Sequence, residues 1–199
     1  MKYLLVLIPI LIIAVGAYYF YRGSSSNSNP NQKVLNDISN LLSLSYTRPL
    51  TAADIEPLRA DVGNDSIANF YIDGAIWFAN HDIQLHIGHN LGDLYNYYFY
   101  GKDEVCVPHD VEHIGDFIRY NDSSLIQPSL GEINRGYADW YQNAVTNEQK
   151  FPATYSNFNQ LAVTINATLQ NLQQGNYLPT LDNISYITQY DYEGCVVTS

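Results

Sequence analysis

An apolar run from Tyr3 to Tyr21 constrains this chain more than any other feature, because it contains no charged residue. In a helix these 19 residues rise by about 28 Å, which is close to the hydrocarbon thickness of a bilayer. The run ends in four aromatic residues, Tyr18 to Tyr21, followed by Arg22, a pattern typical of a membrane interface. We therefore expect residues 1–22 to form a single transmembrane signal anchor.

A cleaved signal peptide is the alternative for the same segment, since Val15-Gly16-Ala17 offers the small residues of a cleavage site. The apolar run is longer than the core of a signal peptide and continues into the aromatic residues. Both features favour an anchor that is retained.

The charge and composition of the remaining chain change abruptly after Arg22. Residues 23–31 contain no apolar side chain and consist mainly of Ser and Asn, which predicts a flexible tether. Residues 32–199 are long enough to fold as one globular ectodomain. All 20 acidic residues but only seven of the nine basic ones follow Arg22.

The acidic balance also limits the partners of the ectodomain. A nucleic-acid surface is not expected, because neutralising phosphates requires clustered Lys and Arg. An acidic domain is also repelled by anionic lipid, so we expect membrane contact only through residues 3–21. Protein partners are expected, and the ectodomain is expected to be lumenal, extracellular or facing a virion shell.

Hydrophobic periodicity predicts a mainly α-helical ectodomain. Asn64-Asp65-Ser66 is a start signal for a helix that contains Phe70, Trp77 and Phe78, and Gly175 is expected to end another. Ser129 and Glu132 have the spacing of a capping box, which predicts a helix start. Alternating apolar residues at 83–87 and 184–192 leave open an α+β fold with a small sheet.

All five histidines fall between His81 and His113, and the last two lie in the segment Pro-His-Asp-Val-Glu-His at 108–113. This segment contains H-x-x-E-H, the pattern of one class of zinc peptidases. In that interpretation His109 and His113 bind zinc, Glu112 is the general base and a carboxylate from elsewhere completes the coordination. His86 and His89 are further candidate ligands for a metal. A metal site requires His109 and His113 to converge with a third ligand from the region between His81 and Asp93.

A simpler interpretation of the segment needs no metal, cofactor or catalytic residue. Pro108 followed by Asp110 and Glu112 is typical of the first turn of a helix. The histidines would then form a solvated cluster whose imidazolium groups pair with carboxylates.

Cysteines and sequons provide candidate covalent features of the ectodomain. Cys106 and Cys195 are the only cysteines and form a candidate disulfide, with two independent thiols as the alternative. Four triplets have the glycosylation pattern, at Asn64, Asn121, Asn166 and Asn183.

Residues 95–100 contain five aromatic side chains in six positions. Successive residues point in different directions, so one core cannot bury all of them, and Tyr is favoured where one end is dry and the other wet. Ordinary Tyr-rich packing is the alternative, and an interface is our expectation for Tyr95, Tyr97, Tyr98, Phe99 and Tyr100.

Two functions fit these observations. The first is a non-enzymatic, membrane-anchored structural or interaction protein, such as a minor capsid component or membrane-to-capsid linker of a virion. The second is a membrane-tethered hydrolase that uses zinc bound at residues 109–113.

Overall fold

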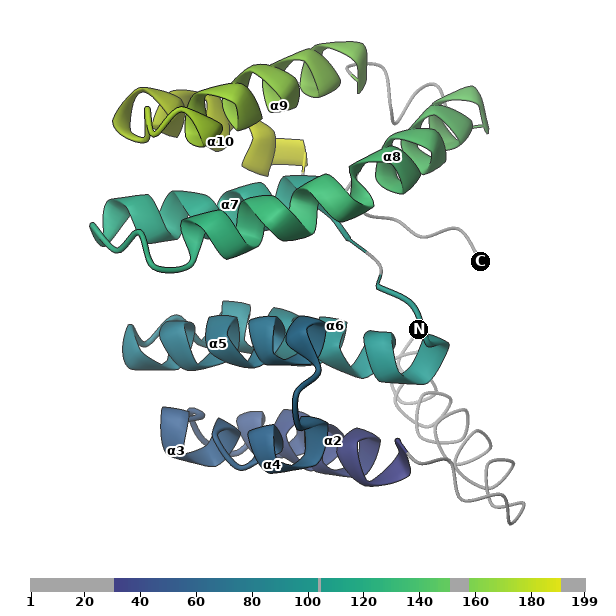
Figure 1. Ribbon diagram of the computed structural model, residues 1–199, viewed down its shortest axis with the longest axis vertical. Helices are drawn as coiled ribbons and strands as arrows, with labels where there is room; N and C mark the ends of the chain where they lie inside the picture. Colours follow the sequence, from purple (N-terminus) through teal and green to yellow (C-terminus); the bar gives the residue numbers. More distant parts are fainter. Residues whose placement is uncertain (1–30, 104, 151–157, 191–199) are drawn as a thin grey trace, which may run out of the picture. The chain divides into compact units, whose positions relative to one another are not determined.

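The computed structural model describes residues 31–103, 105–150 and 158–190, and these segments are mainly helical (Figure 1). The N-terminal helices are α2 (Gln32–Ser45), α3 (Ala52–Ile55), α4 (Leu58–Val62), α5 (Ser66–Asn80) and α6 (Gln84–Tyr100). They are followed by α7 (Val107–Arg119), α8 (Ile126–Lys150), α9 (Phe158–Gln173), η1 (Leu178–Thr180), α10 (Leu181–Ile187) and η2 (Thr188–Tyr190).

The small sheet that the alternating residues left open is absent from the described residues. Residues 84–87 instead form the first turn of α6, in which Leu85 is exposed and Ile87 is buried. Residues 184–190 lie in α10 and η2, and Ile184 and Ile187 are both fully buried. A spacing of three residues puts these two side chains on one helix face, so helical packing outweighs the short alternating pattern.

Three helix boundaries follow the local signals in the sequence. Asp65 caps α5 because its carboxylate accepts hydrogen bonds from the backbone N–H groups of Ile67 and Ala68, each 3.1 Å long. Gly175 lies just beyond α9 with φ +79°, a backbone conformation that suits glycine at a helix end. α7 begins at Val107 with Pro108 in its first turn.

The start of α8 differs from the prediction. The helix begins at Ile126, so Ser129 and Glu132 lie inside it rather than at its cap, and both are buried. The capping-box prediction is therefore wrong, because the packing of buried residues such as Ile126 and Leu130 extends the helix toward the N-terminus.

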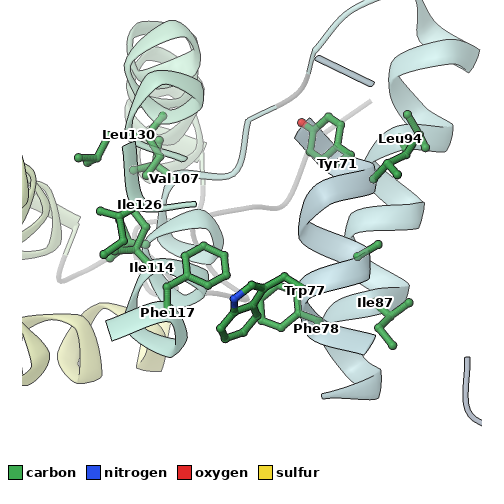
Figure 2. Packing of buried hydrophobic residues seen from close by; sticks show 14 of the residues in the cluster. Tyr71, Trp77, Phe78, Ile87, Leu94, Val107, Ile114, Phe117, Ile126 and Leu130 are labelled. Carbon is green, nitrogen blue, oxygen red and sulfur yellow. The ribbon is translucent and has the colours of Figure 1, made fainter. Parts of the chain in front are cut away.

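The described helices share one hydrophobic core. α5 packs along α6, whereas α7 packs against α8 and α10. Aromatic side chains connect α5 with α7: the ring of Phe117 lies 4.6 Å from that of Trp77 and 5.6 Å from that of Phe78, centroid to centroid (Figure 2). The seam between α7 and the α5–α6 pair is thus built from large side chains that keep the backbones apart.

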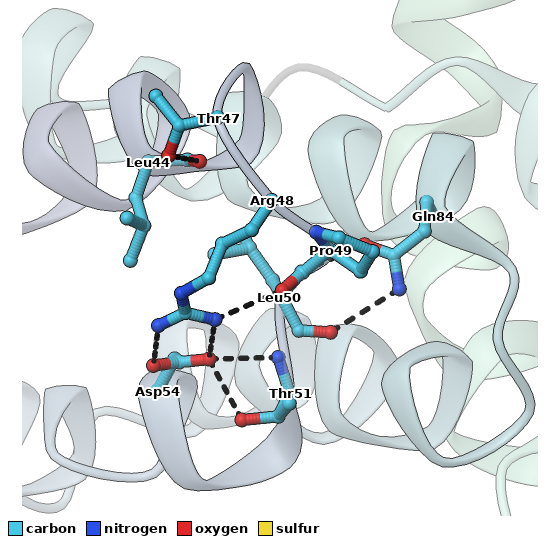
Figure 3. Close-up of polar contacts among 8 residues, drawn as sticks. All are labelled: Leu44, Thr47, Arg48, Pro49, Leu50, Thr51, Asp54 and Gln84. Carbon is cyan, nitrogen blue, oxygen red and sulfur yellow. Dashed lines mark hydrogen bonds and ion pairs between the residues drawn. The ribbon is translucent and has the colours of Figure 1, made fainter.

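The segment between α2 and α3 is fixed by polar contacts (Figure 3). Asp54 accepts two hydrogen bonds from the Arg48 guanidinium, of 2.6 and 2.8 Å, and two more from the N–H and hydroxyl of Thr51. The side-chain amide of Gln84 exchanges hydrogen bonds with the backbone of Leu50. These contacts attach the start of α3 to the start of α6.

No helix in the described ranges is long and apolar enough to cross a membrane. The predicted anchor at residues 1–22 and all of the predicted tether except Asn31 lie outside the described residues.

Candidate metal site

Four of the five histidines meet at the seam between α6 and α7. His86 and His89 are three residues apart on α6, and His109 and His113 are four residues apart on α7, so each pair shares one helix face. His86, His109 and His113 are buried, and His89 is half-buried. We call these four residues the histidine cluster.

The distances within the histidine cluster are those of potential metal ligands. His86, His89 and His113 each offer a ring nitrogen, and these three atoms lie within 4.8 Å of one another. Nε2 of His109 lies 2.6 Å from Nδ1 of His89, a hydrogen bond whose donor depends on the tautomers. The structure therefore brings His113 together with two potential ligands from α6, while His109 contacts one of them, His89.

The aromatic ring of Phe78 packs against two histidines of the cluster. The ring of Phe78 lies 4.8 Å from that of His86 and 4.7 Å from that of His113, centroid to centroid. Nε2 of His113 is buried and has no hydrogen-bond partner. A buried nitrogen without a partner costs roughly 1–3 kcal/mol, so a ligand that bonds to Nε2 of His113 would relieve this cost.

Burial favours the neutral form of three of the imidazoles. It lowers the pKa of His109 to about 3, with the neighbouring His89 and His86 adding to the effect. Burial also lowers the pKa of His113 well below its ordinary value and, less strongly, the pKa of His89. A neutral imidazole is the form that binds a metal, and the interpretation as solvated imidazolium groups does not fit the buried rings of His109 and His113.

Carboxylates border the cluster on α7. Oε1 of Glu112 lies 4.0 Å from Nε2 of His86, and burial raises the pKa of this half-buried acid. Asp110 is buried and, with His109 and His113, forms a second group whose ligand atoms lie within 4.8 Å of one another. Oδ2 of Asp116 lies 3.0 Å from Nδ1 of His86.

Asp116 is the residue that the sequence analysis missed. Its spacing of three residues after His113 places it on the same face of α7, and this spacing is the signal by which it could have been found.

His81 does not join the cluster. Its ring stacks on Trp77 with 3.9 Å between the centroids, and its Nδ1 lies 2.7 Å from the backbone oxygen of Trp77. His81 therefore packs against the end of α5, in the turn that leads to α6, and not against the other histidines.

Cys106 occupies the N-cap position of α7 and is disulfide-bonded. Its predicted partner, Cys195, lies outside the described residues. The bond at Cys106 is adjacent to the first turn of α7, which carries His109.

The aromatic residues of 95–100 divide between two environments. Tyr97 and Tyr98 are half-buried and donate to the Asp65 carboxylate over 3.1 and 3.4 Å. Phe99 and Tyr100 are 55 % and 59 % exposed, and Tyr95 stacks on Phe99 with 5.7 Å between the ring centroids. The role of these residues as an interface stays a prediction.

The four sequons differ in their surroundings. Asn64 and Asn121 are exposed and lie in turns between helices. Asn166 lies within α9, where the Thr168 of its triplet is fully buried, and Asn183 is half-buried within α10. Glycosylation stays a prediction at all four positions.

The chain matches no protein-family model, no curated protein and no solved structure. The case for a function therefore rests on the chemistry of the histidine cluster.

Proposed function

We propose that this protein is a transition-metal-binding protein whose bound ion joins α6 to α7. The observation that carries the proposal is the convergence of His86, His89 and His113, with His109 hydrogen-bonded to His89, in a buried seam. Imidazole nitrogens suit zinc, copper, nickel and iron, whereas magnesium and calcium prefer oxygen ligands.

Holding an ion would require the side chains of the histidine cluster to adjust. Ligands 2.0–2.1 Å from a tetrahedral zinc ion lie roughly 3.3 Å from one another. The nitrogens of His86, His89 and His113, which lie within 4.8 Å of one another, would have to approach, and the 2.6 Å contact between His89 and His109 would have to open for His109 to join them.

An ion would also satisfy the buried polar groups of the seam. Nε2 of His113 has no partner, and a coordinate bond would supply one. Because burial already favours the neutral imidazoles, few protons need to leave when the ion enters.

The number of protein ligands separates a structural ion from a hydrolytic one. Four protein ligands complete a tetrahedral zinc site, whereas a catalytic zinc keeps one position for water. His86, His89 and His113 form one group of three potential ligands, and His109 would have to leave its contact with His89 to become the fourth. Glu112, the general base of the zinc-peptidase interpretation, lies close to His86 but is not needed to complete the ligand set.

The predicted role of the anchor complements this proposal. Residues 3–21 would hold the metal-binding domain at a membrane, and a structural or interaction role there, as in a virion, agrees with the acidic, Tyr-rich composition of the chain. The anchor lies outside the described residues, so this role stays a prediction.

Metal analysis of the full-length chain, purified in detergent without a polyhistidine tag, tests the proposal. After exposure to zinc and dialysis against buffer without chelator, we expect the wild type and His81→Gln to retain stoichiometric zinc and His113→Leu to lose it. His81→Gln is the matched control, because it removes a histidine outside the cluster. A wild type without stoichiometric metal, tested also with cobalt, nickel and copper, would overturn the proposal.

A further inference from the structure

The carboxylate of Asp116 lies next to the ring of His86, one of the candidate metal ligands. Its Oδ2 is 3.0 Å from Nδ1 of His86, and its other oxygen accepts a hydrogen bond of 3.0 Å from Arg119. The side chains of Asp116 and His86 are only 16 % and 8 % exposed. The Arg119 contact therefore holds a largely buried carboxylate against the imidazole.

The surroundings of His86 leave its two nitrogens with different roles. Nδ1 faces Asp116, while Nε2 lies 4.0 Å from Oε1 of Glu112. Phe78 meets the ring edge-on, and His89 stacks beside it with 5.5 Å between the centroids. If Nδ1 carries a proton toward Asp116, the lone pair available to an ion is the one on Nε2.

We infer that Asp116 is a positioning residue that holds His86 in the Nδ1–H tautomer, so that Nε2 binds the ion. The inference rests on the proposed function. Metal-binding histidines commonly donate their second ring nitrogen to a carboxylate, which fixes the ring and increases the basicity of the ligand. Nδ1 of His86 has no hydrogen-bond partner although Oδ2 of Asp116 is 3.0 Å away, and a rotation of the ring would align the two groups.

The charge of Asp116 has a second effect at this site. Neutral imidazoles do not neutralise a divalent cation, and a buried charge is costly without a counter-charge. Asp116 places a carboxylate close to one ligand without occupying a coordination position, and its partner Arg119, which is more exposed to solvent, offsets part of this charge.

Zinc affinity of the full-length chain tests the inference by competition with a chromophoric chelator. We expect Asp116→Asn to weaken binding by about 10- to 100-fold. Asp139→Asn, which removes one exposed carboxylate from α8, should bind as the wild type does. Equal affinity of both variants would overturn the inference, whereas a wild type that binds no metal contradicts the proposed function instead.

The tautomer of His86 provides a second readout that requires neither metal nor a folded variant. In long-range ¹H–¹⁵N spectra of the metal-free, histidine-labelled wild type, we expect the Nδ1–H form of His86. Asp116→Asn should lose this preference, because an amide can both donate and accept. A wild-type His86 in the Nε2–H form would overturn the inference whether or not Asp116→Asn folds.

Discussion

The two sides of α7 make contrasting contacts. Toward α5 and α6 the helix presents His109, His113 and Phe117 to other histidines and aromatic rings. Toward α10 it presents Gly115, at which an added Cβ would come within 2.7 Å of Ile184. Ile114 is fully buried in the apolar core (Figure 2).

The contrast shows two ways of holding one helix in place. Close-packed apolar side chains stabilise the fold without any further component. The histidine side buries polar nitrogens, and two of them, Nδ1 of His86 and Nε2 of His113, have no hydrogen-bond partner, so its stability depends on what binds there. The loss of unfolding free energy caused by a substitution on the apolar side should therefore not depend on metal. The effect of a substitution on the histidine side should depend on it.

The largest effect is expected from Ile114→Ala on the apolar side. Removal of a fully buried isoleucine side chain should lower the free energy of unfolding by about 2–5 kcal/mol, since it leaves a cavity. Denaturant unfolding of the full-length chain, with and without zinc, measures this loss. Val163→Ala on the exposed side of α9 is the control, and a loss that disappears in zinc would break the contrast.

The second-largest effect is expected from His113→Leu on the histidine side, and it concerns the stabilisation of the protein by zinc. Without metal we expect a change within about 1 kcal/mol, because leucine fills a similar volume and removes an unpartnered nitrogen. Zinc at 100 times its dissociation constant should stabilise the wild type by about 2.7 kcal/mol but leave this variant unchanged. Thermal melting with zinc and with chelator measures both, and equal stabilisation of the two proteins would contradict the metal site.

The smallest effect is expected for a substitution of Asp54. Its hydrogen bonds are exposed to solvent and serve as a reference for the buried contacts of α7. Its hydrogen bonds, the largest from Arg48, lower the pKa of its carboxyl in the folded protein. Its contribution is therefore present above the unfolded pKa of about 4 and is lost as the pH falls below it. Water screens the pair, so Asp54→Asn should only slightly flatten the acid side of a plot of melting temperature against pH.

Local signals in the sequence predicted the helices better than the boundaries that depend on packing. The Asp65 cap and the first turn of α7, which contains Pro108, were predicted because both depend on residues close together in the chain. Ser129 and Glu132 carried an equally good local signal, but apolar contacts of the preceding turn extend α8 to Ile126. The alternating residues at 83–87 were too few to compete with a 17-residue helix.

The candidate site was predictable in part for the same reason. The spacing of His109 and His113 is a local property, and it correctly placed both on one helix face. The separation of His81 from the other histidines was not predictable, because it depends on stacking against Trp77. The spacing of Asp116 from His113 indicated a shared helix face, but its contact with His86, 30 positions earlier, depends on the tertiary structure.

The sequence by itself determined the helical character of the described domain and which histidines share a face, since both follow from spacing along one helix. Only the tertiary structure decided that α6 and α7 turn those faces toward each other, that three of the four histidines are buried, and that Asp116 lies behind His86. The physical reason is that pairing of helix faces depends on packing among residues distant in the chain, above all Phe78, Trp77 and Phe117.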